Sequence, residues 1–322
     1  MCITIATTSH PDFPFILLSN RDEYFKRPTD PARFRKLNEK VQILTPLDMA
    51  RPEHGTWIGI TTTGKIAVLV NYRDIDTEST LSEVSRGVLP LSYLKSDLSD
   101  EEWRDKLMSN MESDQGEIDI TKIGGFSLLY GTLNLNPKTN KVEHLNILSN
   151  RGHHGKIFED NRSMNVSESE FDDEREIAEK TTFGLSNSLY NEPWKKVKMG
   201  EKLLISLIKK SVENNYDESK LVEGCFDILK TDTFNRSIYE GKDFDAKIME
   251  LRNSIFIPPI ERNGPESNVL SIGRYYGTRT QTIILLNKNG ELSYYERNMH
   301  SSDTPEPDKP IITSCYKYNV WN

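Results

Sequence analysis

The sequence predicts an α+β protein in which two packed antiparallel sheets carry helices on their outer faces. Three observations lead to this fold class. Apolar runs occur in pairs around short turns, as they do in β-hairpins. Segments with helical apolar spacing lie between these hairpins rather than after each strand. The strict βαβ alternation of a parallel sheet is missing, so the arrangement favours α+β over α/β.

The first hairpin sets the position of the only cysteine near the chain start. The run "ITIA" alternates as a strand does, residues 9–14 supply the turn, and "FILLS" reads as the returning strand. If Thr8 faces Phe15, antiparallel pairing places Cys2 opposite Arg21, within about two positions. The hairpin therefore brings Cys2 to the stretch "NRDE", where the returning strand ends.

Three further hairpins follow along the chain. Their sequences are "TWIGITTTGKIAVLVNY" with a turn at Gly64, "FSLLYGTLNLNPKTNKVEHLNILSN" with a turn at Asn136, Pro137 and Asn140, and "TQTIILLNKNGELSYYERN" with a turn at Asn289-Gly290. Glycine and asparagine are the residues that tight hairpin turns select. Together with the first hairpin, they predict about eight strands.

Helices are predicted between the hairpins. Ser99 and Glu102 form a capping-box pattern, after which Trp103, Leu107 and Met111 recur on one helical face. Two further apolar stripes predict helices through Leu203, Leu204, Leu207, Ile208 and Val212, and through Leu221, Cys225 and Ile228. Cys225 is therefore expected in the core.

Composition limits the function classes. The 322 residues are 36% hydrophobic and 28% charged, the balance of a soluble globular protein. A net charge of -8 gives no general attraction to phosphate backbones, so nucleic acid is not an expected partner. The three cysteines are odd in number, far apart and free of any CxxC pair, which argues against a disulfide framework or a zinc site.

The chain start and the apolar runs indicate where in the cell the protein is expected. There is no basic segment at the start, and His10, Pro11, Asp12 and Pro14 interrupt any apolar signal region. The runs "FPFILL", "IAVLV" and "TIILL" are shorter than the roughly 20 residues of a membrane helix. We expect a cytoplasmic protein with no membrane-spanning segment. No Pro/Gly/Ser-rich linker divides residues 1–322, which are predicted to form a single domain.

Cys2 has two interpretations. If Met1 is removed, the free α-amine has a pKa of about 7.7 to 8.0 and provides the thiol with its own general base. Arg21 would then lower the thiol pKa, and Asp22 would orient the ammonium as the third member of a triad does. The alternative is a small buried hydrophobe beside a surface ion pair.

A family resemblance favours the first interpretation. The motifs "MCI", "SNRDE", "GTWIGI", "LVNYR", "SRG", "YGTLNL", "GLSN…PWKKV" and "GTRTQTIIL" occur in the order seen in the NRDE family, also called the transport and Golgi organisation protein two family. That family is similar to the N-terminal nucleophile hydrolases, notably the penicillin and bile-salt amidases. The resemblance implies a four-layer αββα sandwich of two antiparallel sheets, with Cys2 as the nucleophile.

The resemblance also assigns roles near Cys2. Asp22 matches the aspartate beside the nucleophile's amine in those amidases. Arg21 matches less well, because their arginine lies three residues before that aspartate, where this chain has Ser19. The role of Arg21 in holding a thiolate is therefore less well supported than that of Asp22.

More distant positions complete the expected site. Asn187, in "LSNSLYNEPW", resembles the asparagine that supplies an oxyanion donor, although a turn or cap residue is an equal alternative. Arg279, in "GTRTQT", resembles a late arginine that braces the site, although it could be exposed at a strand start. Asn20 and Asn71 are expected to contact substrate. The alternative for Asn71 is a simple strand end.

Two classes of function stay open. The first is a hydrolase that cleaves an amide or thioester through an acyl-Cys2 intermediate. The second is a non-catalytic carrier or chaperone of haem or of a lipid or acyl ligand, with mitochondrial or Golgi association implied by the resemblance. Both functions need a small-molecule ligand. The sequence predicts no resident cofactor or metal for either. The pair His153-His154 could ligate haem iron, although an adjacent pair without a third ligand is more typical of a surface loop.

Overall fold

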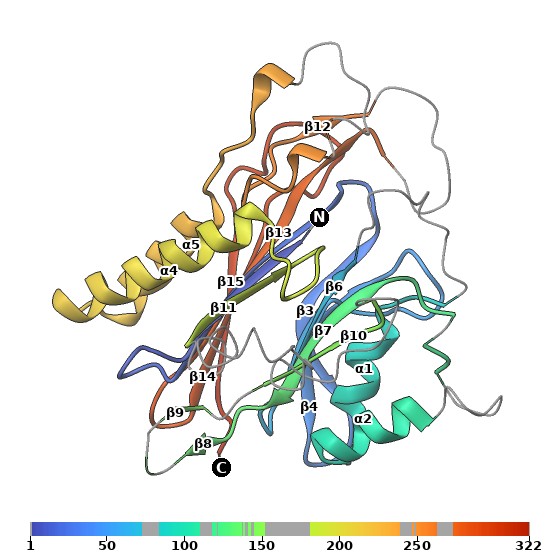
Figure 1. Ribbon diagram of the computed structural model, residues 1–322, viewed down its shortest axis with the longest axis vertical. Helices are drawn as coiled ribbons and strands as arrows, with labels where there is room; N and C mark the ends of the chain where they lie inside the picture. The colour runs from blue at the N-terminus through green and yellow to red at the C-terminus, as the bar shows by residue number, and fades with distance from the viewer. Residues whose placement is uncertain are drawn as a thin grey trace, which may run out of the picture.

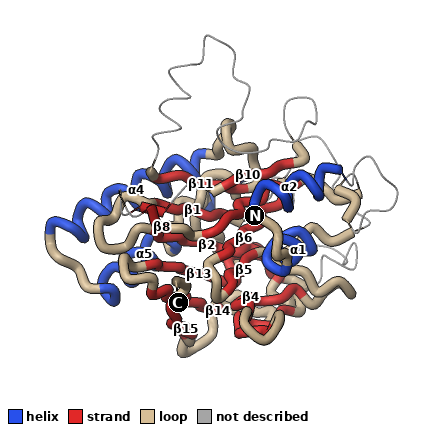
Figure 2. The backbone as a smooth tube through the Cα atoms, turned by 90° about the horizontal axis from the view of Figure 1, so that it is seen from below, coloured by secondary structure: helices blue, strands red, loops and turns tan. Residues whose placement is uncertain are grey.

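Two antiparallel sheets stack face to face and carry helices on both outer faces in a computed structural model of the chain. In Figure 1, α4 and α5 cover one sheet, and α1 and α2 cover the other. Figure 2, turned by 90°, again shows the two helical pairs on opposite sides of the strands. The structure describes residues 2–72, 84–109, 118–120, 122–136, 138, 141–142, 145–151, 181–238, 247, 249–262 and 273–321. These layers confirm the predicted α+β class and the αββα order.

The first sheet contains both ends of the described chain. Its strands follow the order β11-β1-β2-β13-β14-β15, and β12 also pairs with β13. Their bounds are β1 Ile3–Thr7, β2 Phe15–Tyr24, β11 Thr182–Ser186, β12 Ile260–Glu261, β13 Tyr275–Leu286, β14 Glu291–Asn298 and β15 Thr313–Asn319. The predicted hairpin turn before Glu291 is confirmed, because Gly290 adopts a φ of 83° that glycine accepts without strain.

The second sheet follows the order β10-β7-β6-β5-β4-β3. Its strands are β3 Thr29–Lys36, β4 Gln42–Asp48, β5 Ile58–Thr61, β6 Lys65–Asn71, β7 Phe126–Thr132 and β10 Asn146–Ser149. Along the chain between β7 and β10, β8 Leu135–Asn136 pairs with β9 Lys141–Val142 in a separate short ribbon. The predicted pairing of β5 with β6 around Gly64, which has a φ of 88°, is confirmed. So is the pairing of β7 with β10.

The helices bury one apolar face each against a sheet. They are α1 Val88–Lys95, α2 Asp100–Ser109, α4 Lys195–Glu213 and α5 Glu218–Leu229. The short 3-10 helix η3 Arg236–Ile238 is exposed at Arg236 and Ser237. The capping box of α2 forms as predicted: Ser99 N donates to a Glu102 carboxylate oxygen, and Glu102 N donates to Ser99 Oγ. Among the helices in the described ranges, none is both long enough and apolar enough to cross a bilayer.

Three apolar clusters hold the layers together. One lies between the sheets and includes Leu17, Val68 and Ile284. A second packs Ile3 and other first-sheet residues against α4 and α5, where Cys225 is buried as predicted. A third packs the second sheet against α1 and α2. Because successive side chains of a strand point to opposite faces, β1, β2, β13 and β14 each contribute to the first two of these clusters.

Candidate active site around Cys2

Strand pairing places Cys2 where the sequence predicts it. Ile3 pairs with Asn20 across β1 and β2, so the next residue toward the chain start faces Arg21. On the other side, Ile3 pairs with Ser186 of β11, and Ser186 Oγ donates a 2.7 Å hydrogen bond to the carbonyl oxygen of Cys2. Cys2 is thereby fixed between two strands at one end of the sandwich.

The thiol of Cys2 is half-buried and packs against the core between the sheets. Burial raises its pKa above the ordinary value, and the Asp22 carboxylate raises it further. The chain-terminal ammonium, the Asp22 backbone N–H and the Arg21 guanidinium all lower it, but by less in sum. The group therefore rests as a thiol near neutral pH and needs a base to become a nucleophile.

Arg21 lies on the same face as Cys2 and joins the two sheets. Its side chain is 3% exposed, its Nη2 donates to Asp48 Oδ2 at 2.6 Å, and its guanidinium lies 4.1 Å from the ring centroid of Trp57. The arginine charge acts on the Cys2 pKa in the predicted direction. Burial outweighs this effect, and the role of Arg21 in holding a thiolate stays a prediction.

Asp22 points away from the inter-sheet core and into the layer under α4. Its Oδ1 accepts a 2.7 Å hydrogen bond from Thr278 Oγ1. Its Oδ2 lies 3.9 Å from Lys196 Nζ, and both side chains are fully buried. Burial lowers the Lys196 pKa, while Asp22 and Cys2 both raise it. Cys2, Asp22 and Lys196 thus share one electrostatic environment, and contact of Asp22 with a free α-amine stays a prediction.

Asn20 does not face the site. Its Nδ2 donates to the carbonyl oxygens of Leu229 and Ile255, both at 2.9 Å, and its Oδ1 accepts from Gln281 Nε2 at 3.3 Å. Asn20 lies one residue from Arg21 on β2, so its side chain points to the opposite, helix-covered face. The expected substrate contact is wrong, and Asn20 instead ties β2 to the loops after α5.

Asn187 and Asn71 meet where the two sheets end. Asn187 directly follows β11, is 4% exposed, and donates from Nδ2 to the backbone oxygen of Asn71, the last residue of β6. An amide nitrogen carries two hydrogens, so the second remains for a ligand. Asn187 Oδ1 is buried and has no hydrogen-bond partner among the described residues. Such an amide, beside the strand that holds Cys2, suits an oxyanion donor.

Arg279 braces a turn next to the site. It occupies the irregularity between Thr278 and Thr280, where the pairing of β13 with β2 shifts register. Its Nη1 donates to the carbonyl oxygens of Tyr24 and Arg27. Burial lowers the pKa of Arg279 to about 10, and the neighbouring Arg21 charge adds to this effect. Arg279 therefore positions the turn that follows "NRDE" through hydrogen bonds to that turn rather than to Cys2.

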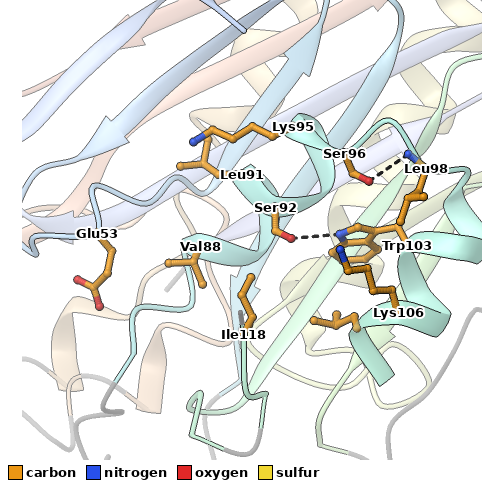
Figure 3. A pocket seen from close by; sticks show the side chains of 11 residues that line it. Glu53, Val88, Leu91, Ser92, Lys95, Ser96, Leu98, Trp103, Lys106 and Ile118 are labelled. Carbon is orange, nitrogen blue, oxygen red and sulfur yellow. Dashed lines mark hydrogen bonds between the residues drawn. The ribbon is translucent and has the colours of Figure 1, made fainter. Parts of the chain in front are cut away.

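A cavity in the described part of the chain lies away from these residues. It has a volume of about 370 Å³ and lies beside α1 and α2, on the outer face of the second sheet (Figure 3). Val88, Leu91 and Trp103 line it, and none of the predicted site residues does. Within the described ranges, no three His, Cys, Asp or Glu side chains gather as metal ligands. The pair His153-His154 lies outside the described residues.

Lys196 is the site residue that sequence reasoning missed. It stands in "PWKKV" between two other lysines, a pattern typical of a solvated helix start. The available signal was spacing: Lys196, Gly200, Leu204 and Ile208 recur every four residues and share one face of α4. Extending the predicted apolar stripe backwards would have placed this lysine under the sheet.

Known proteins resemble this chain over nearly its whole length. A protein of Saccharomyces cerevisiae with no assigned function is 29% identical over 318 residues, covering 94% of this chain and 93% of that protein. The mouse Transport and Golgi organization 2 homolog is 28% identical over 318 residues, covering 96% and 93%. Among solved structures, a C2A mutant of the conjugated bile acid hydrolase from Clostridium perfringens is similar at 12% identity with a TM-score of 0.41, covering 99% and 98%. Residues 1–301 match the family model described as Transport and Golgi organisation 2. The chain therefore belongs to the Transport and Golgi organisation 2 family.

Proposed function

We propose that the protein is an N-terminal-cysteine hydrolase that cleaves an amide or thioester bond of a small molecule through an acyl-Cys2 intermediate. The observation that supports this most directly is the environment shared by Cys2, Asp22 and Lys196: the buried Asp22 carboxylate lies 3.9 Å from Lys196 Nζ and raises the pKa of both Cys2 and Lys196. Buried titratable groups that perturb one another cluster at functional sites more than elsewhere.

The reaction follows from the groups present. After removal of Met1, the α-amine of Cys2 takes the thiol proton while the sulfur forms a bond to the substrate carbonyl carbon. The second N–H of Asn187 stabilises the resulting oxyanion. The amine returns the proton to the leaving nitrogen or sulfur as the carbon–leaving-group bond breaks. Water then hydrolyses the thioester and restores the thiol. The raised thiol pKa makes this base necessary rather than optional.

The state of the chain start tests the proposal. Protein from its native host is expected to lack Met1 by intact mass. Its Cys2 should react with iodoacetamide faster than the Cys2 of protein made under inhibition of methionine aminopeptidase, because the ammonium that lowers the thiol pKa moves one residue closer. A Cys315→Ala background removes the exposed thiol from the measurement.

Cys225 provides the internal reference for this experiment. It is fully buried, and burial raises its pKa, so its alkylation should be slower than that of Cys2. A population that retains Met1, with Cys2 no more reactive than Cys225, would contradict the nucleophile assignment.

Asn187→Ala is expected to reduce acyl transfer by about a hundredfold to a thousandfold, the usual effect of losing one oxyanion donor. The loss should fall on kcat, because the donor acts on the transition state. Asn191→Ala, at an exposed position of the same loop, is the matched control and should retain full activity. Unchanged turnover in a folded Asn187→Ala protein would remove Asn187 from the reaction.

A non-catalytic carrier is the second candidate, and the raised pKa of Cys2 favours it, since a resting thiol is a poor nucleophile. In that case haem, a lipid or an acyl ligand would bind without turnover, and Cys2→Ala would leave its affinity unchanged. The description of the family, transport and Golgi organisation, supports a role in organising the Golgi. A mitochondrial association and a small-molecule partner stay proposals.

A further inference from the structure

Arg86 is held in a fixed position at the edge of the second sheet. It precedes α1, and the backbone at the next residue, Gly87, packs closely against another chain segment. A side-chain carbon built on Gly87 would lie 2.9 Å from the Cα atom of Gly55, closer than real atoms approach. Thr56 N also donates to the Gly87 carbonyl oxygen at 2.9 Å. Gly55 and Gly87 let their two chain segments pack in contact, and this contact positions the backbone next to Arg86.

Among the described residues, no carboxylate forms an ion pair with the guanidinium of Arg86. A side-chain carbon on Gly124 would lie 2.1 Å from Arg86 Nη2, so the group fits against this glycine and no larger residue. Arg86 Nε is buried and has no hydrogen-bond partner in the described part of the chain. A buried donor without an acceptor is costly, and native proteins usually satisfy such groups with protein, water or an ion.

The charges that act on the pKa of Arg86 are cations. Burial, together with repulsion from Arg151 and then Arg51, lowers the pKa of Arg86 to about 10. Arg51 is compensated by Glu53, whose carboxylate lies 3.4 Å away and also accepts the backbone N–H of Ser85 at 3.0 Å. Arg86 and Arg151 therefore form a positive pair at this edge.

This pair lies at the same end of the sandwich as Cys2. The side chain of Arg151 lies beside Gly125 and Tyr72, as a carbon built on Gly125 would lie 3.0 Å from Arg151 Cγ and 3.1 Å from Tyr72 Cβ. Tyr72 directly follows Asn71, whose backbone oxygen accepts the Asn187 amide. Arg151 therefore lies beside the end of β6, which contacts Asn187 directly after β11.

We propose that Arg86 and Arg151 form a binding site for an oxyanion, a phosphate or carboxylate group. Guanidinium groups bind such anions through paired N–H···O bonds, and the half-buried fork of Arg86, packed against Gly124, suits this geometry. Identifying the anion as part of the substrate rests on the proposed acyl transfer, and it would make the substrate an acyl compound with an acidic group. Anion binding itself does not depend on that chemistry.

Inorganic phosphate and acetate are the probes, titrated by calorimetry into Cys2→Ala protein at constant ionic strength. We expect Arg86→Met to weaken phosphate binding at least about tenfold, the equivalent of one charge-assisted hydrogen bond. The phosphate affinity of Arg86→Lys should lie between those of the parent and Arg86→Met, because lysine keeps the positive charge but lacks the two-pronged guanidinium. Arg236→Met removes an exposed arginine paired with Asp232 and should have no effect. Tighter binding of phosphate than acetate would assign a phosphate group, and the reverse a carboxylate.

Thermal unfolding distinguishes this site from a purely structural arginine. In chloride buffer, Arg86→Met should unfold at the same or a higher temperature than the parent, because it removes a buried cation without a partner. Phosphate should raise the parent's midpoint and leave that of Arg86→Met unchanged. Parent protein that binds neither anion, or phosphate that stabilises both proteins equally, would overturn the proposal. The Cys2→Ala background makes this outcome independent of whether acyl transfer occurs.

Discussion

Replacing Cys2 with alanine is expected to abolish acyl transfer, with a loss of about a millionfold, the scale seen when a hydrolase loses its nucleophile. The thiol is the atom that forms the covalent intermediate, so no other group of the site replaces it. Incubation with a panel of N-acyl amides and acyl thioesters should add an acyl mass to the parent protein and none to Cys2→Ala. The cysteine is only half-buried, so the variant should fold.

A one-residue extension separates the amine from the thiol. Placing alanine before Cys2 moves the terminal amine by about 3.5 Å along the chain and leaves the thiol in place. Acyl transfer should be lost although the circular dichroism spectrum is unchanged. Cys315→Ala, which removes an exposed thiol, is the control and should keep full activity. Turnover by the extended protein would exclude the α-amine as base and direct attention to Lys196.

The hairpins were predictable because their signals are local. The register that brings Cys2 to Arg21 follows from one turn of known length and from the period of two in a strand. The capping box of Ser99 and Glu102 was predictable for the same reason, because the side chain of each residue accepts a hydrogen bond from the backbone N–H of the other. Local patterns of this kind need no knowledge of the rest of the fold.

Elements stabilised by distant contacts were missed. Strand β3, with the sequence "TDPARFRK", carries a proline and four charges, which argue against a strand. It forms because it is the edge strand of its sheet and because Ala32 and Phe34 still face tertiary partners: Ala32 N donates to Glu296, and Phe34 packs on Tyr316. Helix α1 is eight residues long and apolar on most sides, so its sequence has no clear helical period.

The site shows the same division between local and distant information. Arg21 and Cys2 were matched by register, whereas the error at Asn20 came from treating four consecutive residues as one group. Neighbouring residues of a strand point to opposite faces, so Asn20 and Arg21 cannot both face Cys2. The strength of burial was also hidden in the sequence. An arginine beside a thiol suggests a thiolate, but the packing of β1 between β2 and β11 reverses the net direction of the pKa.

Lys196→Met is expected to destabilise the protein by about 3 to 5 kcal/mol, the cost of leaving one member of a buried ion pair uncompensated. Asp22 would keep its charge with Lys196 Nζ, 3.9 Å away, removed. Lys198→Met is the matched control, because Lys198 lies two residues further along α4 and is exposed. Chemical denaturation should show a lower midpoint for Lys196→Met and none of that loss for Lys198→Met.

The double variant Asp22→Asn/Lys196→Met completes the argument, because it removes both charges and keeps the hydrogen bond from Thr278 Oγ1 to Oδ1. It should recover part of the stability lost in Lys196→Met, since a buried polar pair replaced on both sides costs less than one broken on one side. Burial also lowers the folded-state pKa of Lys196, so between that value and the ordinary 10.5 the unfolded chain binds more protons. Raising the pH through this window should therefore increase the stability of the parent relative to Lys196→Met. Two results together would show that Asp22 and Lys196 are not coupled and would remove the lysine from the environment of Cys2. In the first, the stability losses of the two single variants add in the double variant. In the second, the stability difference between the parent and Lys196→Met does not change with pH.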